Sequence, residues 1–143
     1  MVASGFTVLK LALRSGPDSD EFRTVETISR AIAPKAQVAV DALGAFTLGE
    51  AQRVGAELDR LGNIAWFEDA LLPDDLPKYP LLARSVDTAI CAGEMLSTRY
   101  QFRDLLVQRG ADLVNPDLCR AGGLTECRRI AWIADAFGAL WAP

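Results

Sequence analysis

Four acidic residues recur at nearly regular intervals, each at the end of a short apolar segment. Asp41 ends QVAVD, Glu68 ends IAWFE, Glu94 ends TAICAGE and Asp117 ends ADLVNPD, in steps of 27, 26 and 23 residues. Carboxylate oxygens supplied by separate strands are ligands that suit Mg²⁺, which keeps open positions for water and substrate. Because clustered carboxylates repel one another, such a group of acids requires a cation. The spacing therefore predicts a magnesium site.

Each acid also has a plainer interpretation, in which it only caps the helix that follows its strand. For any one acid taken alone, this interpretation is the better one. Four acids in register favour a shared site instead, because two of them are Glu, which is a poor helix cap.

Basic residues occur in the same segments. Lys10 lies in the first apolar run, on the same side as Ala12. A lysine inside a parallel barrel is costly unless a carboxylate or an anionic substrate meets it, and the alternative is a lysine at a strand end that reaches solvent. Arg99, Arg103 and Arg120 lie near strand ends, where they either hold an anion or pair with acids on helix surfaces. We assign Arg120 to substrate binding.

The segments that carry these residues alternate between strand-like and helix-like patterns. Six apolar runs favour strands, at residues 6–13, 37–42, 64–69, 87–94, 111–117 and 139–143. Four amphipathic segments predict helices, at residues 21–33, 47–62, 97–110 and 123–138, and a proline-interrupted stretch at 71–86 predicts a short or broken helix. The runs are apolar throughout, which is typical of strands covered by helices on both faces. This alternation predicts a parallel α/β sheet, open or closed, with its chemistry at the carboxyl ends of the strands.

The starts of several helices carry their own signals. We expect Ser19 or Asp20 to cap the first helix. Thr47 followed by Glu50 has the form of a capping box at the start of the second. Thr125 is expected to cap the last helix.

Composition narrows the classes of protein further. The chain has 143 residues, of which 50% are hydrophobic and 24% charged, with a net charge of −4, which is typical of one soluble domain. No apolar run approaches the ~20 residues of a membrane span, and no Lys/Arg cluster suggests nucleic acid or an anionic membrane as a partner. The three cysteines lack a CxxC spacing, which predicts reduced thiols in the cytoplasm. The absence of histidine excludes histidine-ligated zinc and Ser-His or Cys-His catalysis by this chain alone.

Seven pieces of the sequence, in order, resemble the mandelate racemase/muconate lactonizing group of the enolase superfamily. They are GFTVLKL, VAVDA, WFEDA, AGE, TRYQFRDLL, NPDLCRAGGLTE and WAP, and from the first piece to the last the resemblance extends over nearly the whole chain. Within that group, EDALLPDD, TRYQFRDL and GGLTE are most similar to acid-sugar dehydratases of the rhamnonate or galactonate type.

The resemblance implies a role for each residue. Asp41, Glu68 and Glu94 match the three magnesium ligands on successive barrel strands. Lys10 matches the first lysine of the KxK motif, which faces the substrate carboxylate, and Asp117 matches the aspartate of a catalytic His-Asp dyad. The chemistry of the family abstracts a proton alpha to a carboxylate, and magnesium stabilises the resulting enediolate. In the dehydratases a beta hydroxyl then leaves as water.

The sequence also departs from the pattern of the family. Ala12 stands in place of the second lysine of KxK, which favours dehydratases over racemases that need two bases. Leu43 replaces an asparagine that often follows the first ligand. The dyad histidine is expected just after WAP, where the chain ends, and we expect the N-terminal capping domain of the family to lie outside residues 1–143. Since a closed (β/α)8 barrel takes about 250 residues, we expect residues 1–143 to form a partial barrel of about six strands and five helices, truncated at both ends.

Three hypotheses follow for the function. The first is a cytoplasmic, magnesium-dependent sugar-acid dehydratase, homo-oligomeric as a full-length parent and inactive as this fragment alone. The second is a racemase or epimerase of the same superfamily. The third is a non-catalytic, truncated remnant, whose open sheet edges would invite pairing with another chain.

Overall fold

One parallel sheet of six strands organises the protein. A computed structural model describes residues 2–143, in which the strands pair in chain order from β1 to β6. Their bounds are β1 Val8–Ala12, β2 Gln37–Asp41, β3 Ile64–Glu68, β4 Ile90–Ala92, β5 Leu113–Val114 and β6 Leu140–Trp141. All five pairings are parallel, which confirms the predicted fold class.

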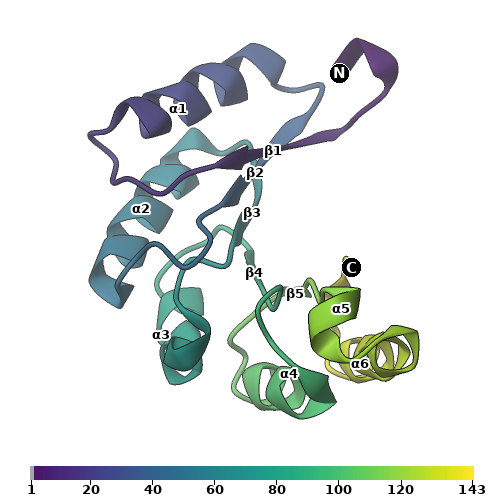
Figure 1. The fold of residues 1–143 in the computed structure, drawn as a ribbon. Helices are drawn as coiled ribbons and strands as arrows, with labels where there is room; N and C mark the ends of the chain where they lie inside the picture. The colour runs from purple at the N-terminus through teal and green to yellow at the C-terminus, as the bar shows by residue number, and fades with distance from the viewer. Residues whose placement is uncertain (1) are drawn as a thin grey trace.

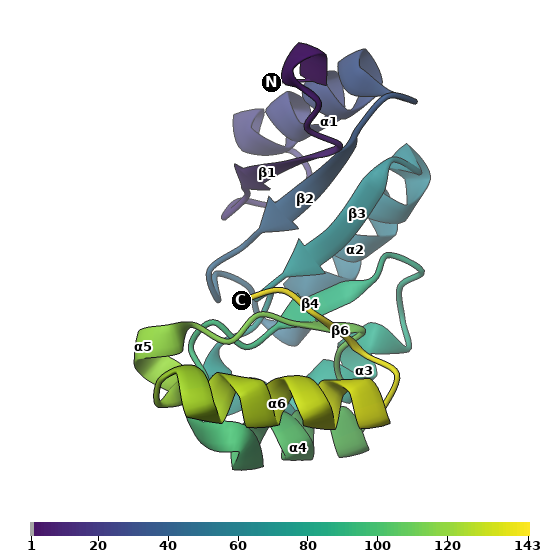
Figure 2. The ribbon, with the colours of Figure 1, turned by 90° about the vertical axis from the view of Figure 1, so that its right-hand side faces the viewer.

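Helices connect each strand to the next, and a short 3-10 helix, η1, precedes β1. Their bounds are η1 Val2–Ser4, α1 Asp20–Ile32, α2 Leu48–Leu61, η2 Pro73–Lys78, α3 Tyr79–Ala83, α4 Thr98–Val107, α5 Leu118–Ala121 and α6 Leu124–Ala136. The sheet curves, and α1 to α4 and α6 lie along its outer side (Figures 1 and 2). The helices thus cover one face of the sheet rather than the two that the apolar strand runs suggested. None of the described helices is both long and apolar enough to cross a membrane.

Local sequence signals explain where most of these helices begin. The Ser19 side chain accepts a hydrogen bond from the backbone N–H of Phe22 at 3.1 Å, so α1 begins at Asp20. The predicted capping box is present at α2, where the Glu50 carboxylate accepts from the backbone N–H of Thr47 at 2.9 Å. Both caps are therefore confirmed.

The segment after β5 differs from the prediction. A short helix, α5, precedes α6, which brings the number of α-helices among residues 2–143 to six rather than five. Gly122 ends α5 with φ +111° and Gly123 caps α6 with φ +88°, a backbone region that L residues with a Cβ rarely adopt. Thr125 lies inside α6, so its prediction as the cap is wrong.

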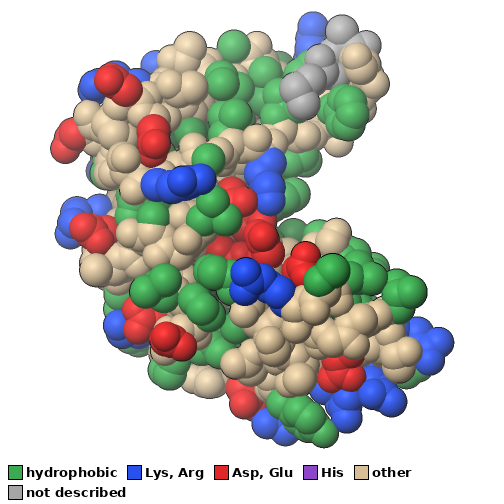
Figure 3. All heavy atoms as spheres, viewed as in Figure 1, with side chains coloured by type: hydrophobic (Ala, Val, Ile, Leu, Met, Phe, Trp, Pro, Cys, Tyr) green, Lys and Arg blue, Asp and Glu red, His purple; other side chains and the backbone are tan. Residues whose placement is uncertain are grey.

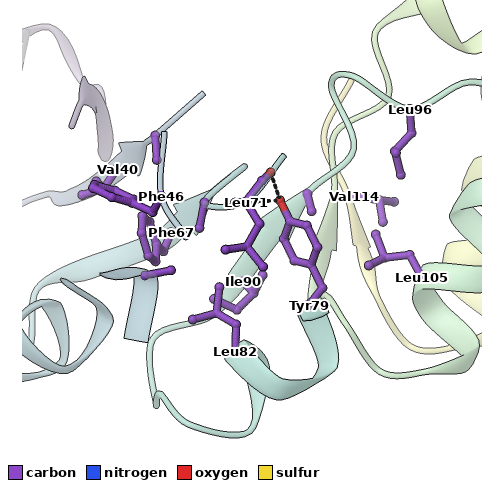
Figure 4. Close-up of a cluster of buried hydrophobic side chains, with 14 of the residues drawn as sticks. Val40, Phe46, Phe67, Leu71, Tyr79, Leu82, Ile90, Leu96, Leu105 and Val114 are labelled. Atoms are coloured by element: carbon purple, nitrogen blue, oxygen red, sulfur yellow. Dashed lines mark hydrogen bonds between the residues drawn. The ribbon is translucent and has the colours of Figure 1, made fainter. Parts of the chain in front are cut away.

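The main core fills the space between the sheet and the outer helices. Alternate strand residues point into it, including Val38 and Val40 of β2, Phe67 of β3 and Ile90 of β4. Tyr79 of α3 is buried among them, and its hydroxyl donates to the backbone carbonyl of Leu71 at 2.9 Å (Figure 4). The remaining strand positions face the inner side of the sheet, where the polar residues gather.

Candidate metal centre

Three carboxylates meet at the carboxyl ends of neighbouring strands. Asp41 is the last residue of β2 and Glu68 the last of β3, and the two are partners in the strand register. Glu94 lies two residues beyond the end of β4. One carboxylate oxygen from each residue lies within 4.8 Å of those of the other two. Asp41 and Glu68 are both buried, so their charges are largely removed from water.

Glu94 is presented by a turn and not by a strand. The sequence predicts a strand over residues 87–94, whereas β4 covers only Ile90–Ala92. Gly93 takes φ +137°, and a Cβ added there would lie 2.5 Å from Cε1 of Phe102. Glycine is therefore required at this position, and its conformation turns the chain immediately before Glu94.

The ammonium group of Lys10 lies against two of the three acids. Its Nζ is 3.1 Å from Oδ2 of Asp41 and 2.8 Å from Oε1 of Glu68. Burial lowers the pKa of Lys10, but the hydrogen bonds and charges of Glu68 and Asp41 outweigh this effect and hold the pKa above its ordinary value. The structure thus agrees with the interpretation in which carboxylates contact Lys10, although the Lys10 side chain stays half exposed.

Both oxygens of Glu68 have further partners on the inner side of the sheet. The indole N–H of Trp66 donates to Oε2 at 2.8 Å, and the Asn115 side-chain amide donates to Oε1 at 3.0 Å. Oε1 also accepts from Lys10. The Glu68 carboxylate is therefore fixed in orientation by residues from β1, from β3 itself and from the segment after β5.

Asp69 is a second buried acid directly beside Glu68. Its oxygens accept hydrogen bonds from the backbone N–H groups of Gly93 at 3.0 Å and Glu94 at 3.3 Å, and from the Asn115 amide at 3.4 Å. Burial raises the pKa of Asp69 to about 6, against the opposing effect of the hydrogen bonds from Gly93 and Asn115. Asp69 thus connects the end of β3 to the turn that carries Glu94.

Four of the predicted residues, Lys10, Glu68, Glu94 and Asp117, share one cavity on the open side of the sheet. Figure 3 shows the hollow there, with acidic and basic side chains gathered inside it. The cavity measures about 380 Å³ and is lined by Lys10, Trp66, Glu68, Cys91, Glu94, Asn115, Pro116, Asp117, Ala142 and Pro143. A cavity of this size can admit a small polar molecule beside the carboxylates.

Asp117 and Arg120 have different surroundings. The Asp117 carboxylate accepts from the backbone N–H of Arg120 at 2.8 Å and so caps α5, as the plainer interpretation of the strand-end acids predicts. Asp117 also lines the cavity, although it stands outside the group of three carboxylates. Arg120 is exposed and is absent from the cavity lining, so its role in substrate binding stays a prediction. Arg99 pairs with Glu126 at 2.7 Å on the outer helices.

The donor set fits a divalent cation such as Mg²⁺. All three converging ligand atoms are carboxylate oxygens, the hard donors that Mg²⁺ prefers. Asp41, Glu68 and Glu94, when ionised, carry three negative charges and Lys10 balances one of them. A divalent cation would neutralise the remaining two negative charges, which Lys10 leaves unbalanced.

The whole chain, residues 1–143, matches the enolase C-terminal domain-like family. It belongs to this family. The resemblance drawn from the sequence motifs is therefore confirmed. Among the relatives of this family member, D-xylonate dehydratase of Haloferax volcanii is 34% identical over 125 residues, which make up 87% of this chain and 30% of that protein.

A second relative extends over nearly the full chain. D-galactarolactone cycloisomerase of Agrobacterium fabrum is 30% identical over 141 residues, which make up 99% of this chain and 37% of that protein. The chain thus spans 30% and 37% of the lengths of these two relatives. Sugar-acid dehydratases and a cycloisomerase are both represented among the proteins that it resembles.

Solved structures confirm the fold assignment. L-talarate dehydratase from Polaromonas sp. JS666, solved with Mg and L-glucarate, superposes with a TM-score of 0.88 at 29% identity. The match covers 96% of this chain and 37% of that one. The six parallel strands therefore correspond to part of an enolase-superfamily barrel, as predicted.

Sequence reasoning missed three polar residues of the site, namely Trp66, Asp69 and Asn115. Trp66 precedes Glu68 by two residues, and strand alternation places both on the same face. Asn115 likewise follows directly after β5 and precedes Asp117 by two residues. Alternation could have identified these two. The only sequence signal for Asp69 as a site residue is that it directly follows another acidic residue, Glu68.

Proposed function

We propose that a protein carrying this chain removes the proton alpha to the carboxylate of a sugar acid and then eliminates water, with Mg²⁺ as its cofactor. The observation that carries this proposal is the group of three carboxylates from three successive βα units, beside a lysine and a cavity. The dehydratases among the relatives of the chain support the reaction class.

In this proposal residues 1–143 form the part of the barrel that binds the metal. Asp41, Glu68 and Glu94 would hold Mg²⁺, which when bound supplies positive charge next to the substrate carboxylate, where negative charge develops as the alpha proton leaves. The capping domain that selects the substrate in this family would be supplied from outside these residues, in a homo-oligomeric, cytoplasmic protein.

Lys10 and Asp117 would have the other roles that this chain contributes to the reaction. Lys10 lines the cavity and would bind the substrate carboxylate through its ammonium group. Asp117 lines the same cavity and would orient a histidine supplied from outside these residues, which contain none. That histidine would act as the acid or base. The substrate loses its alpha proton and its beta hydroxyl, so one water is released and a 2-keto-3-deoxy acid is formed.

Magnesium titration of the purified chain by calorimetry tests the metal site. We expect saturable binding to the wild type, loss of that binding in Glu94→Gln, and unchanged binding in the control Glu26→Gln, which alters a helix-surface ion pair on α1. A folded wild type that binds no Mg²⁺ would contradict the proposed site. Circular dichroism of each sample establishes that it is folded.

Product analysis tests the reaction. A protein of the length of its relatives that carries this chain should convert a sugar acid into a 2-keto-3-deoxy acid. Racemisation or epimerisation of the substrate without loss of water would instead support the second hypothesis. Ala12 argues against that outcome, because it removes one of the two bases that a racemase places on opposite faces of the substrate.

A further inference from the structure

The turn that presents Glu94 is held from outside its own strand. β4 ends at Ala92, so the ladder of the sheet no longer fixes Gly93 and Glu94. Both of their backbone N–H groups donate instead to the Asp69 carboxylate, Gly93 to Oδ1 at 3.0 Å and Glu94 to Oδ2 at 3.3 Å. The direction in which Glu94 leaves the sheet is therefore set by Asp69.

The same carboxylate is joined to Glu68 through Asn115. The Asn115 amide nitrogen contacts both Oε1 of Glu68 and Oδ2 of Asp69, at 3.0 and 3.4 Å. Both facing atoms are carboxylate oxygens, so the amide must turn its N–H₂ group toward them. Its oxygen Oδ1 is left buried without a hydrogen-bond partner, a cost that the two charged acceptors offset.

We propose that Asp69, linked through Asn115 to Glu68, is a positioning residue that holds Glu68 and Glu94 at the separation that the metal requires. This inference rests on the proposed magnesium site. It adds that the fixed geometry of two ligands comes from a buried carboxylate that is not itself among the three converging acids.

An amide cannot replace Asp69 in this role. The ionised carboxylate accepts hydrogen bonds on both oxygens, from three donors in all. In Asp69→Asn, the amide N–H₂ group would face either Gly93 N–H or the donors of Glu94 and Asn115. On one side of the contact, the N–H₂ group of the new amide would then face another N–H donor. The turn at Gly93 and Glu94 would therefore lose its fixed position.

Asp59 of helix α2 provides a matched control, because it binds the chain at the opposite end of β4. Its carboxylate accepts from the backbone N–H groups of Asp87 and Thr88 at 3.0 and 2.7 Å, just before β4, whereas Asp69 accepts from the two that follow β4. Asp59→Asn thus disturbs the same kind of carboxylate-to-backbone contact at the start of β4, away from the three carboxylates of the proposed metal site.

The experiment measures the dissociation constant for Mg²⁺ by calorimetry and the midpoint of thermal unfolding, for wild type, Asp69→Asn, Asn115→Ala and Asp59→Asn. We expect Asp69→Asn to weaken Mg²⁺ binding about 10- to 100-fold, the usual effect of losing a residue that orients a metal ligand. Asn115→Ala should weaken it less, because the two backbone contacts of Asp69 remain. Asp59→Asn should lower the unfolding midpoint and leave Mg²⁺ affinity unchanged.

Two results would overturn the inference. One is wild-type affinity in folded Asp69→Asn, or in folded Asn115→Ala if Asp69→Asn does not fold. The other is an equal loss of affinity in Asp59→Asn, which would assign the effect to general stability. A folded wild type that binds no Mg²⁺ overturns the proposed function and this inference together, so the two failures are distinguishable.

Discussion

At the residue scale, Lys10 is placed to interact both with two proposed metal ligands and with the carboxylate of a substrate. Its ammonium group lies 3.1 Å from Asp41 and 2.8 Å from Glu68, both proposed as magnesium ligands, while the family resemblance assigns it to the substrate carboxylate. Since Lys10 remains half exposed, its long side chain can turn toward an anion in the cavity. Its positive charge should then oppose the metal and favour the substrate.

Replacement of Lys10 by Met should therefore change the two affinities in opposite directions. We expect Lys10→Met to bind Mg²⁺ roughly tenfold more tightly, since charges of +1 and +2 about 6 Å apart repel by about 1.4 kcal/mol in water-like surroundings. Binding of a sugar acid should weaken in the same variant. Calorimetric titration with each ligand measures both, with exposed Lys35→Met as the control. Weaker Mg²⁺ binding in Lys10→Met would show that this lysine supports the metal site.

The residues of the site differ in how far sequence predicts them. Asp41 and Glu68 follow from the spacing of strand ends, because a parallel sheet brings all carboxyl ends to one edge. The contacts of Asp69 do not follow from it, because its hydrogen bonds join residues 24 and 46 positions apart and depend on the packed turn. Metal ligands that recur with the βα repeat can be predicted from the sequence. The contacts that position these ligands can be identified only in the folded structure.

At the scale of elements, strand and helix order follows from periodicity, but boundaries follow from single residues. The fourth strand ends at Ala92, before the end of its predicted run, because Gly93 turns the chain. The last helix begins at Leu124 because the glycine pair, with positive φ at both residues, separates it from α5. Periodicity carries no information on such positions, so these bounds were missed.

Helix α2 contains two glycines whose replacement should have opposite effects. A Cβ at Gly55 would lie 2.4 Å from Cγ1 of Val86, whereas one at Gly49 would approach only the end of the Arg53 side chain, at 3.8 Å. Gly55→Ala should destabilise the protein by about 1–3 kcal/mol through overpacking. Gly49→Ala should stabilise it by up to ~1 kcal/mol through helix propensity. Urea unfolding measures both, and a stabilising Gly55→Ala would contradict the close packing of α2 on Val86.

The contact between α4 and α6 should depend on pH through Glu126. Hydrogen bonds from the backbone N–H of Arg99 and from the side chains of Arg129 and Arg99 hold the pKa of Glu126 below its usual value. Because the folded protein then binds the proton less readily than the unfolded chain, Glu126 stabilises the fold at neutral pH and loses this effect on acidification below its usual pKa.

Comparison with Glu126→Gln isolates this contribution. The variant should be less stable than the wild type at pH 7, and the difference should shrink toward about pH 3. Urea unfolding at both values measures it, with Glu26→Gln on α1 as the control. A difference that stays constant with pH would mean that the carboxylate charge contributes nothing to the contact between α4 and α6.

At the scale of the whole molecule, the sheet has two outer strands. In the part of the chain that the structure describes, β1 and β6 each pair with one neighbour only, so one edge of each presents backbone groups that another strand can meet. Large apolar side chains are exposed at both edges, with Phe6 56% and Leu140 65% accessible. The edges therefore combine unpaired backbone with apolar surface.

The purified chain should consequently self-associate through these edges. We expect its mass in solution, measured by light scattering after gel filtration, to rise with concentration, and Leu140→Lys to shift it toward the monomer, because a charge on an edge strand opposes pairing. Val107→Lys is the control, since Val107 is also apolar and exposed but belongs to helix α4 and not to an edge strand. If Val107→Lys disperses the chain as well as Leu140→Lys does, the outer helices drive association and the edges do not. The edge account thus predicts a difference between two exposed apolar positions that hydrophobicity alone does not predict.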